Sequence, residues 1–248
     1  MTAKHNGSVA PKITNYEKNQ RFNPLVSWLH SFRHAHALQS IETLAVPHPD
    51  RPLKVVEIGC AHGQLFPAVN QRYNIDYVGI EPWHKFVKRA NAHYGEHPNF
   101  KVIQGYAEDH FDVLANADVI VALETLEHIP EHTVVRIVEA VAAAKPKLFI
   151  CSVPVEVGPA IWLKNIGSFF CGYMRHKEYT WKETFWAGLG QLDKLPPHGT
   201  DHKGFDWRWL AQTIRHNLKI LKLRRFPFGL APAQFSSSVF FICEPYKT

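Results

Sequence analysis

Short apolar runs alternate with amphipathic segments along most of the chain. The runs "LKVVEIG", "DYVGIEP", "FKVIQG", "ADVIVAL" and "KLFICSV" are rich in Val and Ile and end in polar or glycine-containing turns, which is typical of buried strands. Between them lie "GQLFPAVNQRY", "WHKFVKRANAHYG" and "EHTVVRIVEAVAAAK", whose apolar residues have helical spacing. This alternation indicates βαβ units, and we therefore predict an α/β fold with a mostly parallel, doubly wound sheet that helices cover on both faces.

The two ends of the chain have different patterns. Residues 1–23 are polar, so we expect a mobile leader there. Helical spacing then begins with Leu25, Trp28, Leu29 and Phe32. At the other end, "LKILKLRRFPFG" and "QFSSSVFFICEP" predict two strands joined by a Gly/Pro turn, which would complete the sheet as an antiparallel hairpin. Residues 24–248 then form a single domain.

A long insertion, at about residues 155–204, separates the fifth strand from the helix "FDWRWLAQTI". We expect it to be a lid over the open end of the sheet. A basic aromatic surface of this kind could hold an aromatic or lipid-like acceptor, stack RNA bases or lie on a membrane, and the plainer alternative is a lid packed on the core. Its aromatic and basic residues are Trp162, Phe169, Phe170, Tyr173, Tyr179, Trp181, Phe185 and Trp186 with Lys164, Arg175, Lys177 and Lys182.

Composition narrows the class of protein. The chain has 248 residues, 46% of them apolar, which suffices for one sizeable core. It contains no apolar run long enough for a membrane span or a signal peptide, so we expect a cytoplasmic protein.

Its four cysteines are far apart in the sequence, which predicts reduced thiols. The net charge of +6 is concentrated in the later half of the chain, where it indicates a solvated basic face or an anionic partner.

The stretch "VVEIGCAHG" carries the first chemical signal. Gly59 follows the first strand and Gly63 precedes the first helix, which is the ligand-binding position of a doubly wound sheet. Glu81 lies 22 residues after Gly59, at the end of "YVGIE", where a carboxylate can accept hydrogen bonds from both ribose hydroxyls. The loop and the acid together predict a nucleoside cofactor.

Glu57 distinguishes between two such cofactors. An acid two residues before the loop would repel the pyrophosphate of NAD, whereas it suits the ammonium group of S-adenosylmethionine (SAM), directly or through water. With this acid in place, "VVEIGCAHG", "YVGIEP" and "ADVIVALETLEHIPE" resemble, in order, three motifs of the class I SAM-dependent methyltransferases. The resemblance covers about residues 50–155 and implies a Rossmann-like, seven-stranded sheet with SAM as the cofactor.

The resemblance assigns the SAM site residue by residue. It implies SAM contacts for Glu57, Gly59, Ala61, Gly63, Glu81 and Leu123. The chain has Ala61 where the loop is usually glycine, and "GYAE" where the family often has Gly-Asp-Ala. Tyr106 could stack on the adenine or Glu108 could accept from its amino group, with Ala107 between them, and both alternatives stay open.

"LETLEHIPEH" raises the question of a metal. Glu124, Glu127 and His128 have a spacing that places side chains on one face of a helical turn, and two carboxylates with an imidazole could bind a divalent cation. The E-x-x-E-H pattern resembles ubiquinone-pathway O-methyltransferases and also metal-dependent small-RNA 2′-O-methyltransferases, whose later histidine would correspond to His202 in "TDHKGFDWRWL". In the alternative, which we prefer from the sequence, Glu124 and His128 line the SAM pocket and Glu127 caps the helix that begins near Pro130.

The motifs therefore predict a SAM-dependent methyltransferase. O-methylation of a small-molecule or lipid-like acceptor is the leading expectation, with His128 or His202 as the base and no metal. A metal-dependent RNA 2′-O-methyltransferase and a non-catalytic nucleotide-binding protein of the same fold are the alternatives. An NAD-dependent oxidoreductase is disfavoured by Glu57.

Overall fold

The computed structural model describes residues 34–43, 50–170, 179–199, 202–226 and 232–246, with side chains of 166–170 excepted. The leader, the early helical positions Leu25 to Phe32 and the insertion residues Tyr173, Arg175 and Lys177 lie outside this description, as do the side chains of Phe169 and Phe170. So does the fourth cysteine, Cys171, whereas Cys60, Cys151 and Cys243 are buried free thiols, as predicted.

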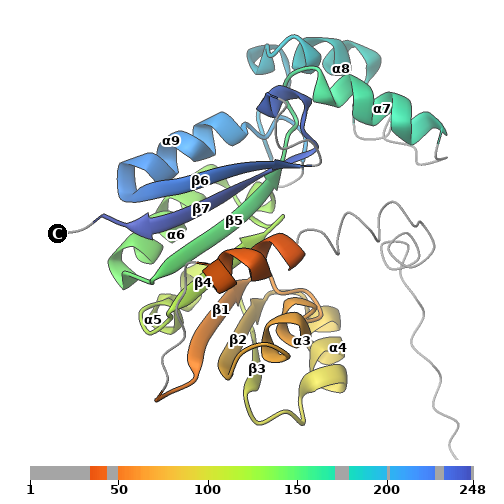
Figure 1. Ribbon diagram of the computed structural model, residues 1–248. Helices are drawn as coiled ribbons and strands as arrows, with labels where there is room; N and C mark the ends of the chain where they lie inside the picture. The colour runs from red at the N-terminus through yellow and green to blue at the C-terminus, as the bar shows by residue number, and fades with distance from the viewer. Residues whose placement is uncertain (1–33, 44–49, 171–178, 200–201, 227–231, 247–248) are drawn as a thin grey trace, which may run out of the picture.

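Seven strands form one sheet with the order β3-β2-β1-β4-β5-β7-β6 (Figure 1). The first five pair in parallel, and β7 is antiparallel to both β5 and β6. This confirms the predicted doubly wound, mostly parallel sheet with its C-terminal hairpin. The strands are β1 (Leu53–Ile58), β2 (Ile75–Glu81), β3 (Phe100–Gln104), β4 (Val119–Leu123), β5 (Leu148–Pro154), β6 (Leu218–Phe226) and β7 (Ser238–Pro245).

Helices connect the strands on both faces. They are α3 (Leu65–Asn70), α4 (His84–Tyr94), α5 (Phe111–Leu114), α6 (Glu131–Ala144), α7 (Ala160–Phe170), α8 (Trp181–Gly188) and α9 (Trp207–Asn217), and residues 34–43 are also helical. Short 3-10 helices lie at η1 (Ala107–Asp109), η2 (Leu126–His128), η4 (Leu192–Lys194) and η5 (Ala233–Phe235).

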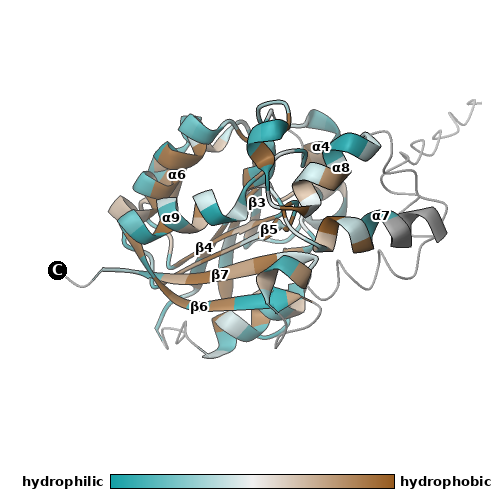
Figure 2. Cartoon of the chain, turned by 90° about the horizontal axis from the view of Figure 1, so that it is seen from above, coloured by the Kyte–Doolittle hydropathy of each residue, from teal (hydrophilic) through white to brown (hydrophobic). Residues whose placement is uncertain are grey.

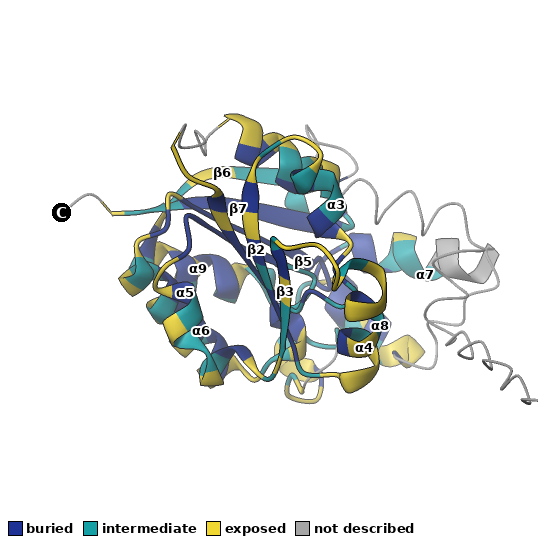
Figure 3. Cartoon of the chain, turned by 90° about the horizontal axis from the view of Figure 1, so that it is seen from below, coloured by how far each residue is buried: buried dark blue, intermediate teal, exposed yellow. Residues whose placement is uncertain are grey.

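The sheet separates two hydrophobic cores because successive strand residues point to opposite faces. Val119 and Val121 pack with α3, α4 and the 34–43 helix, whereas Ile120 and Ala122 pack with α6 and α9. Apolar strands therefore run between two layers of amphipathic helices (Figure 2), and the central strands, such as β4 and β5, are the most buried part of the described chain (Figure 3). Among the described residues, no helix is long and apolar enough to span a bilayer.

The insertion after β5 forms a small structure of its own, with α7 packed against α8 beyond the carboxyl end of β5 (Figure 1). Ile161, Tyr179, Ala187 and Leu195 make its hydrophobic core. The carboxyl ends of the parallel strands lie next to this insertion, and the candidate site is built at those ends.

Candidate functional site

The loop after β1 has the conformation that its glycines favour. Gly59 and Gly63 have φ values of +69° and +76°, in the left-handed region that glycine adopts without strain. A Cβ atom on Gly59 would overlap the side chain of Thr125, which follows β4, so the absence of a side chain lets the two segments pack together. Ala61 also adopts a left-handed conformation, with φ +46°, so the loop keeps its shape at the cost of some strain there.

Glu81 ties this loop to the end of β2. Its Oε2 accepts a hydrogen bond from the Ala61 N–H (2.9 Å), and its Oε1 accepts one from the Trp83 N–H (3.0 Å). Burial raises the pKa of Glu81, and these two hydrogen bonds oppose that rise. Each carboxylate oxygen can accept a further hydrogen bond, so the predicted role toward ribose hydroxyls is compatible with these contacts.

Glu57 lies deeper than the ligand position assumed from the sequence. Its side chain is buried and accepts a hydrogen bond from the Tyr77 hydroxyl on the neighbouring strand. Burial, with a contribution from the charge of Glu81, raises the pKa of Glu57 to about 8, against the effect of the Tyr77 hydrogen bond. In this structure Glu57 is therefore a support beneath the glycine loop, and its predicted interaction with SAM stays a prediction.

Two aromatic side chains are exposed at the ends of β2 and β3. Tyr106 is 61% exposed and Trp83 is 69% exposed, and the strands that precede them pair in parallel, with Glu81 opposite Gln104. Ala107 is buried and Glu108 is half-buried in the adjoining η1. Sequence reasoning missed Trp83, whose position two residues after the ribose acid was the available signal.

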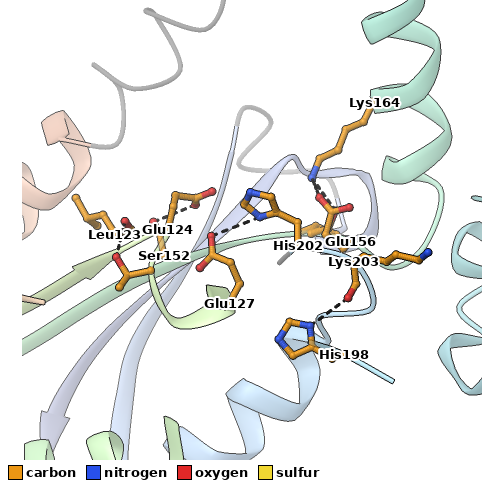
Figure 4. Close-up of polar contacts among 11 residues, drawn as sticks. Leu123, Glu124, Glu127, Ser152, Glu156, Lys164, His198, His202 and Lys203 are labelled. Carbon is orange, nitrogen blue, oxygen red and sulfur yellow. Dashed lines mark hydrogen bonds and ion pairs between the residues drawn. The ribbon is translucent and has the colours of Figure 1, made fainter. Parts of the chain in front are cut away.

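The segment after β4 has an unusual backbone. Leu123 ends the strand, and Glu124 follows in the left-handed region with φ +50°. The Glu124 N–H donates to the Ser152 carbonyl (2.8 Å), and its Oε1 accepts from the Ser152 hydroxyl (3.1 Å; Figure 4). Leu126–His128 then form a 3-10 helix, so the helical turn expected across the E-x-x-E-H pattern begins only after Glu124.

Glu127, His128 and His202 are brought together across the lid insertion. Each offers one ligand atom, and these atoms lie within 4.8 Å of one another. The Glu127 carboxylate has no exposed surface, and its Oε1 is 3.7 Å from His202 Nδ1 (Figure 4). The rings of His128 and His202 meet edge to face, with centroids 4.7 Å apart. We call these three residues the Glu–His–His cluster.

The sequence left open that Glu127 caps the helix that begins near Pro130. Helix α6 begins at Glu131 after Pro130, while the Glu127 carboxylate points toward His202. Its position therefore favours membership of the cluster over the capping role. Glu124, the fourth predicted ligand, is not among the three residues whose ligand atoms converge.

The environment of His202 keeps its imidazole neutral. Burial, together with the proximity of His128, lowers its pKa to about 4, whereas Glu156 and Glu124 oppose the shift. At neutral pH, His202 is thus an uncharged imidazole next to a buried carboxylate. This is the protonation state that a metal ligand requires.

The lid holds the cluster in place from two sides. The Lys203 ammonium pairs with Glu183 on α8 (2.6 Å), and the Gly204 N–H donates to the Tyr179 hydroxyl (3.1 Å). On α7, Lys164 Nζ donates to Glu156 Oε1 and to the Val155 carbonyl, both at 2.8 Å. These contacts fix the segment that carries His202 relative to the end of β5.

Comparison with known proteins identifies the class. Residues 55–146 match the family model described as a methyltransferase domain. Residues 55–146 are therefore a methyltransferase domain, and the sheet order and the glycine loop agree with the class I SAM-dependent methyltransferase fold that the three motifs predicted. No curated protein matches the chain.

The solved structures that share this fold are methyltransferases and related enzymes with different substrates. The methyltransferase domain of bacterial CtHen1-C is 14% identical, with a TM-score of 0.58, and the alignment covers 88% of this chain and 98% of that one. Magnesium protoporphyrin IX methyltransferase from Synechocystis PCC 6803, with bound SAH, is 14% identical, with a TM-score of 0.57 over 96% and 90% of the chains. Mycolic acid cyclopropane synthase CmaA1, in complex with SAH and CTAB, is 10% identical, with a TM-score of 0.59 over 91% and 87%. At these identities the likeness concerns the fold.

Proposed function

We propose that this methyltransferase transfers the methyl group of SAM to a hydroxyl group of a small-molecule or lipid-like acceptor, with the Glu–His–His cluster facing that hydroxyl. The observation that carries the proposal is the convergence of Glu127, His128 and His202 at the carboxyl end of β4, beside the glycine loop. Methyl transfer from a sulfonium leaves a neutral thioether, so the main chemical demands are alignment of the acceptor and removal of its proton. A cluster of carboxylate and imidazole groups next to the SAM loop meets both demands.

In this proposal SAM lies against the loop from Gly59 to Gly63, with Glu81 accepting hydrogen bonds from the ribose. Ala107 is buried next to the adenine position, while Tyr106 and Trp83 offer exposed rings for stacking. Replacing Glu81 by Ala should weaken SAM binding by on the order of 10-fold to 100-fold, because charge-assisted hydrogen bonds are lost. Calorimetry on the folded variant tests this, and an unchanged dissociation constant would remove Glu81 from the site.

Two chemistries fit the cluster. In the metal-free one, His128 takes the proton from the acceptor hydroxyl, since the lowered pKa of His202 makes that imidazole a weak base near pH 7. In the other, Glu127, His128 and His202 hold a divalent cation, for which two imidazoles and a buried carboxylate are a suitable donor set. Such a cation would lower the pKa of a bound hydroxyl. The burial of Glu127 beside a neutral imidazole favours the cation over the metal-free chemistry preferred from the sequence.

The same cluster supports a second acceptor class. The pattern E-x-x-E-H with a later histidine resembles the metal-dependent RNA 2′-O-methyltransferases, and three of its four residues converge here. A ribose hydroxyl of RNA is therefore the alternative acceptor. Mass spectrometry of material that co-purifies with the full chain would distinguish a trapped small molecule or lipid from RNA.

Calorimetric titration with Mn²⁺, Zn²⁺ and Mg²⁺ tests the cluster without an acceptor. We expect stoichiometric binding by the full chain and its loss in Glu127→Gln and in His202→Ala. His132→Ala is the matched control, because His132 is an exposed histidine of α6 outside the cluster. If the full chain binds SAM but none of these cations, the metal proposal fails and His128 remains as the base.

A further inference from the structure

Helix α8 presents a row of large apolar side chains to solvent. Trp181 is 86% exposed, Phe185 is 52% exposed and Leu189, directly after the helix, is 48% exposed. The spacing i, i+4, i+8 places these three residues along one side of the helix. We call them the α8 stripe.

The orientation of α8 is fixed by its other side. Thr184 and Ala187 are buried, and a Cβ atom on Gly188 would overlap the indole of Trp162 on α7. The Trp162 Nε1–H donates to the Thr184 carbonyl (3.1 Å), and Asn165 Nδ2 donates to the Thr184 hydroxyl (2.9 Å). A capping box between Thr180 and Glu183 determines where the helix begins. Because the lid has its own core, the α8 stripe is not needed to hold it together.

Exposed apolar side chains are concentrated on the lid. Of the nine large hydrophobic side chains exposed in the described part of the chain, four belong to α7, α8 and the residue that follows α8, the fourth being Leu163. Trp83 and Tyr106 belong to the proposed SAM site. Such a concentration marks an interaction surface, whereas single exposed apolar residues are ordinary.

The charges around the α8 stripe favour an anionic partner. Lys182 is exposed next to Trp181, and the Lys194 ammonium lies 4.1 Å from the centre of the Trp186 ring. Glu183, the acid of α8, is paired with Lys203. The chain as a whole carries a net charge of +6. Lysine beside exposed Trp and Phe is the composition of helices that lie in the interface of an anionic bilayer.

The size of the stripe favours a bilayer over a protein partner. Side chains of this kind offer on the order of 500 Å² in total, whereas a stable protein interface buries about 800 Å² on each partner. A bilayer needs no complementary pocket, and Trp is enriched at the depth of the headgroups. We propose that the α8 stripe, with Lys182 and Lys194, docks the protein reversibly on an anionic lipid surface.

Docking through α8 would turn the lid toward the bilayer. The same lid positions His202 through Lys203 and Gly204. A lipid-like acceptor could then reach the Glu–His–His cluster from the membrane, and this last step alone rests on the proposed function. The docking itself requires neither SAM nor an acceptor.

The test is co-sedimentation of the full chain with vesicles that contain equal parts of phosphatidylglycerol and phosphatidylcholine, compared with phosphatidylcholine alone. We expect binding to the anionic vesicles that weakens with salt. The double variant Trp181→Ser with Phe185→Ser should reduce the partition coefficient by about tenfold or more. Tyr246→Ser, which removes a 51% exposed aromatic residue outside both the lid and the proposed SAM site, should leave it unchanged.

Folding and cofactor binding are measured on the same preparations. If the double variant keeps the melting temperature and the SAM dissociation constant of the unmodified chain, its loss of vesicle binding is due to the α8 stripe. This conclusion does not depend on the proposed reaction. Equal vesicle binding by the double variant and the unmodified chain would overturn the assignment to α8, and so would no binding by the unmodified chain. A dimer that the double variant dissociates, without vesicle binding, would overturn it in favour of a second copy as the occupant.

Discussion

The Nδ1 atom of His202 lies 3.7 Å from the Oε1 atom of Glu127, although the lid insertion separates the two residues in the sequence. Glu127 is held at the carboxyl end of β4, whereas His202 is held by the lid through its neighbours Lys203 and Gly204. The cluster therefore forms only when the lid has folded onto the sheet. This dependence makes the insertion part of the proposed site.

Glu127→Gln should separate cation binding from folding. Glutamine keeps the shape of the side chain but removes a buried charge, so we expect the melting temperature in EDTA to stay the same or to rise. A cation at 100 times its dissociation constant should stabilise the unmodified protein by about 2.7 kcal/mol and the variant not at all. Thermal melts with and without Mn²⁺ measure both effects. An equal response of the two proteins to Mn²⁺ would place the cation elsewhere.

Glu124→Gly should relieve backbone strain and impair the reaction. Glu124 has φ +50°, a conformation that costs a residue with a Cβ atom about 1 kcal/mol or more, and glycine removes that cost. Lys145→Gly is the matched control, because Lys145 has φ +49° at the exposed end of α6, away from the site. Lys145→Gly should raise the free energy of unfolding by up to about 1 kcal/mol. Glu124→Gly should gain less than Lys145→Gly, because it also removes the acceptor of the hydrogen bond from the buried Ser152 hydroxyl. We expect only Glu124→Gly to reduce methyl transfer, and equal activity of the two variants would show that Glu124 has no role in it.

The pattern of the sequence was sufficient for the sheet and for the position of the glycine loop at its edge. Strand positions such as Val119 to Ala122 alternate between two cores, and this alternation follows from the covalent geometry of a strand. Gly59 directly follows β1 and Glu81 ends β2, so both were expected at the edge where the ends of parallel strands meet, and they lie there. Their contacts with SAM stay predictions.

The side-chain pairings could not be predicted in the same way. The hydrogen bond from Tyr77 to Glu57, which buries an acid expected to meet SAM, depends on the register of β1 with β2. The pairing of Lys164 with Glu156 depends on how the lid folds back on β5. Neither register nor lid packing leaves a periodic signal in one sequence, so these contacts required the structure.

Glu57 should make stability depend on pH. Its pKa is about 8 in the folded chain and near the ordinary value of 4.5 when unfolded, so the folded state holds the proton more tightly. The stabilisation is complete below pH 4.5 and is lost as the pH rises toward 8, by about 1.4 kcal/mol for each unit of pKa difference. Glu57→Gln removes this dependence while keeping an acceptor for Tyr77. Urea denaturation without SAM should therefore show the unmodified chain losing stability relative to the variant between pH 5 and 8. Parallel pH profiles would contradict the burial of a protonated Glu57.

Lys164 and Glu156 should behave as a coupled pair that fastens the lid. The Glu156 side chain is almost fully buried, and Lys164 of α7 donates to it and to the Val155 carbonyl. Lys164→Met leaves a buried carboxylate without its ammonium, so we expect it to destabilise the chain by about 3–5 kcal/mol. Adding Glu156→Gln should recover a large part of that loss, because the uncompensated charge is then gone.

Urea denaturation of the single and double variants measures the coupling of this pair. Lys182→Met is the control, since it removes an exposed lysine from the same lid and should change stability by no more than about 0.5 kcal/mol. Calorimetric titration of the double variant with Mn²⁺ also measures the cation affinity of the Glu–His–His cluster. If the lid is fastened through this pair, the double variant should bind a cation more weakly even where its stability is restored, because His202 is positioned by the lid. Additive effects on stability together with unchanged cation affinity would show that the pair does not position the lid.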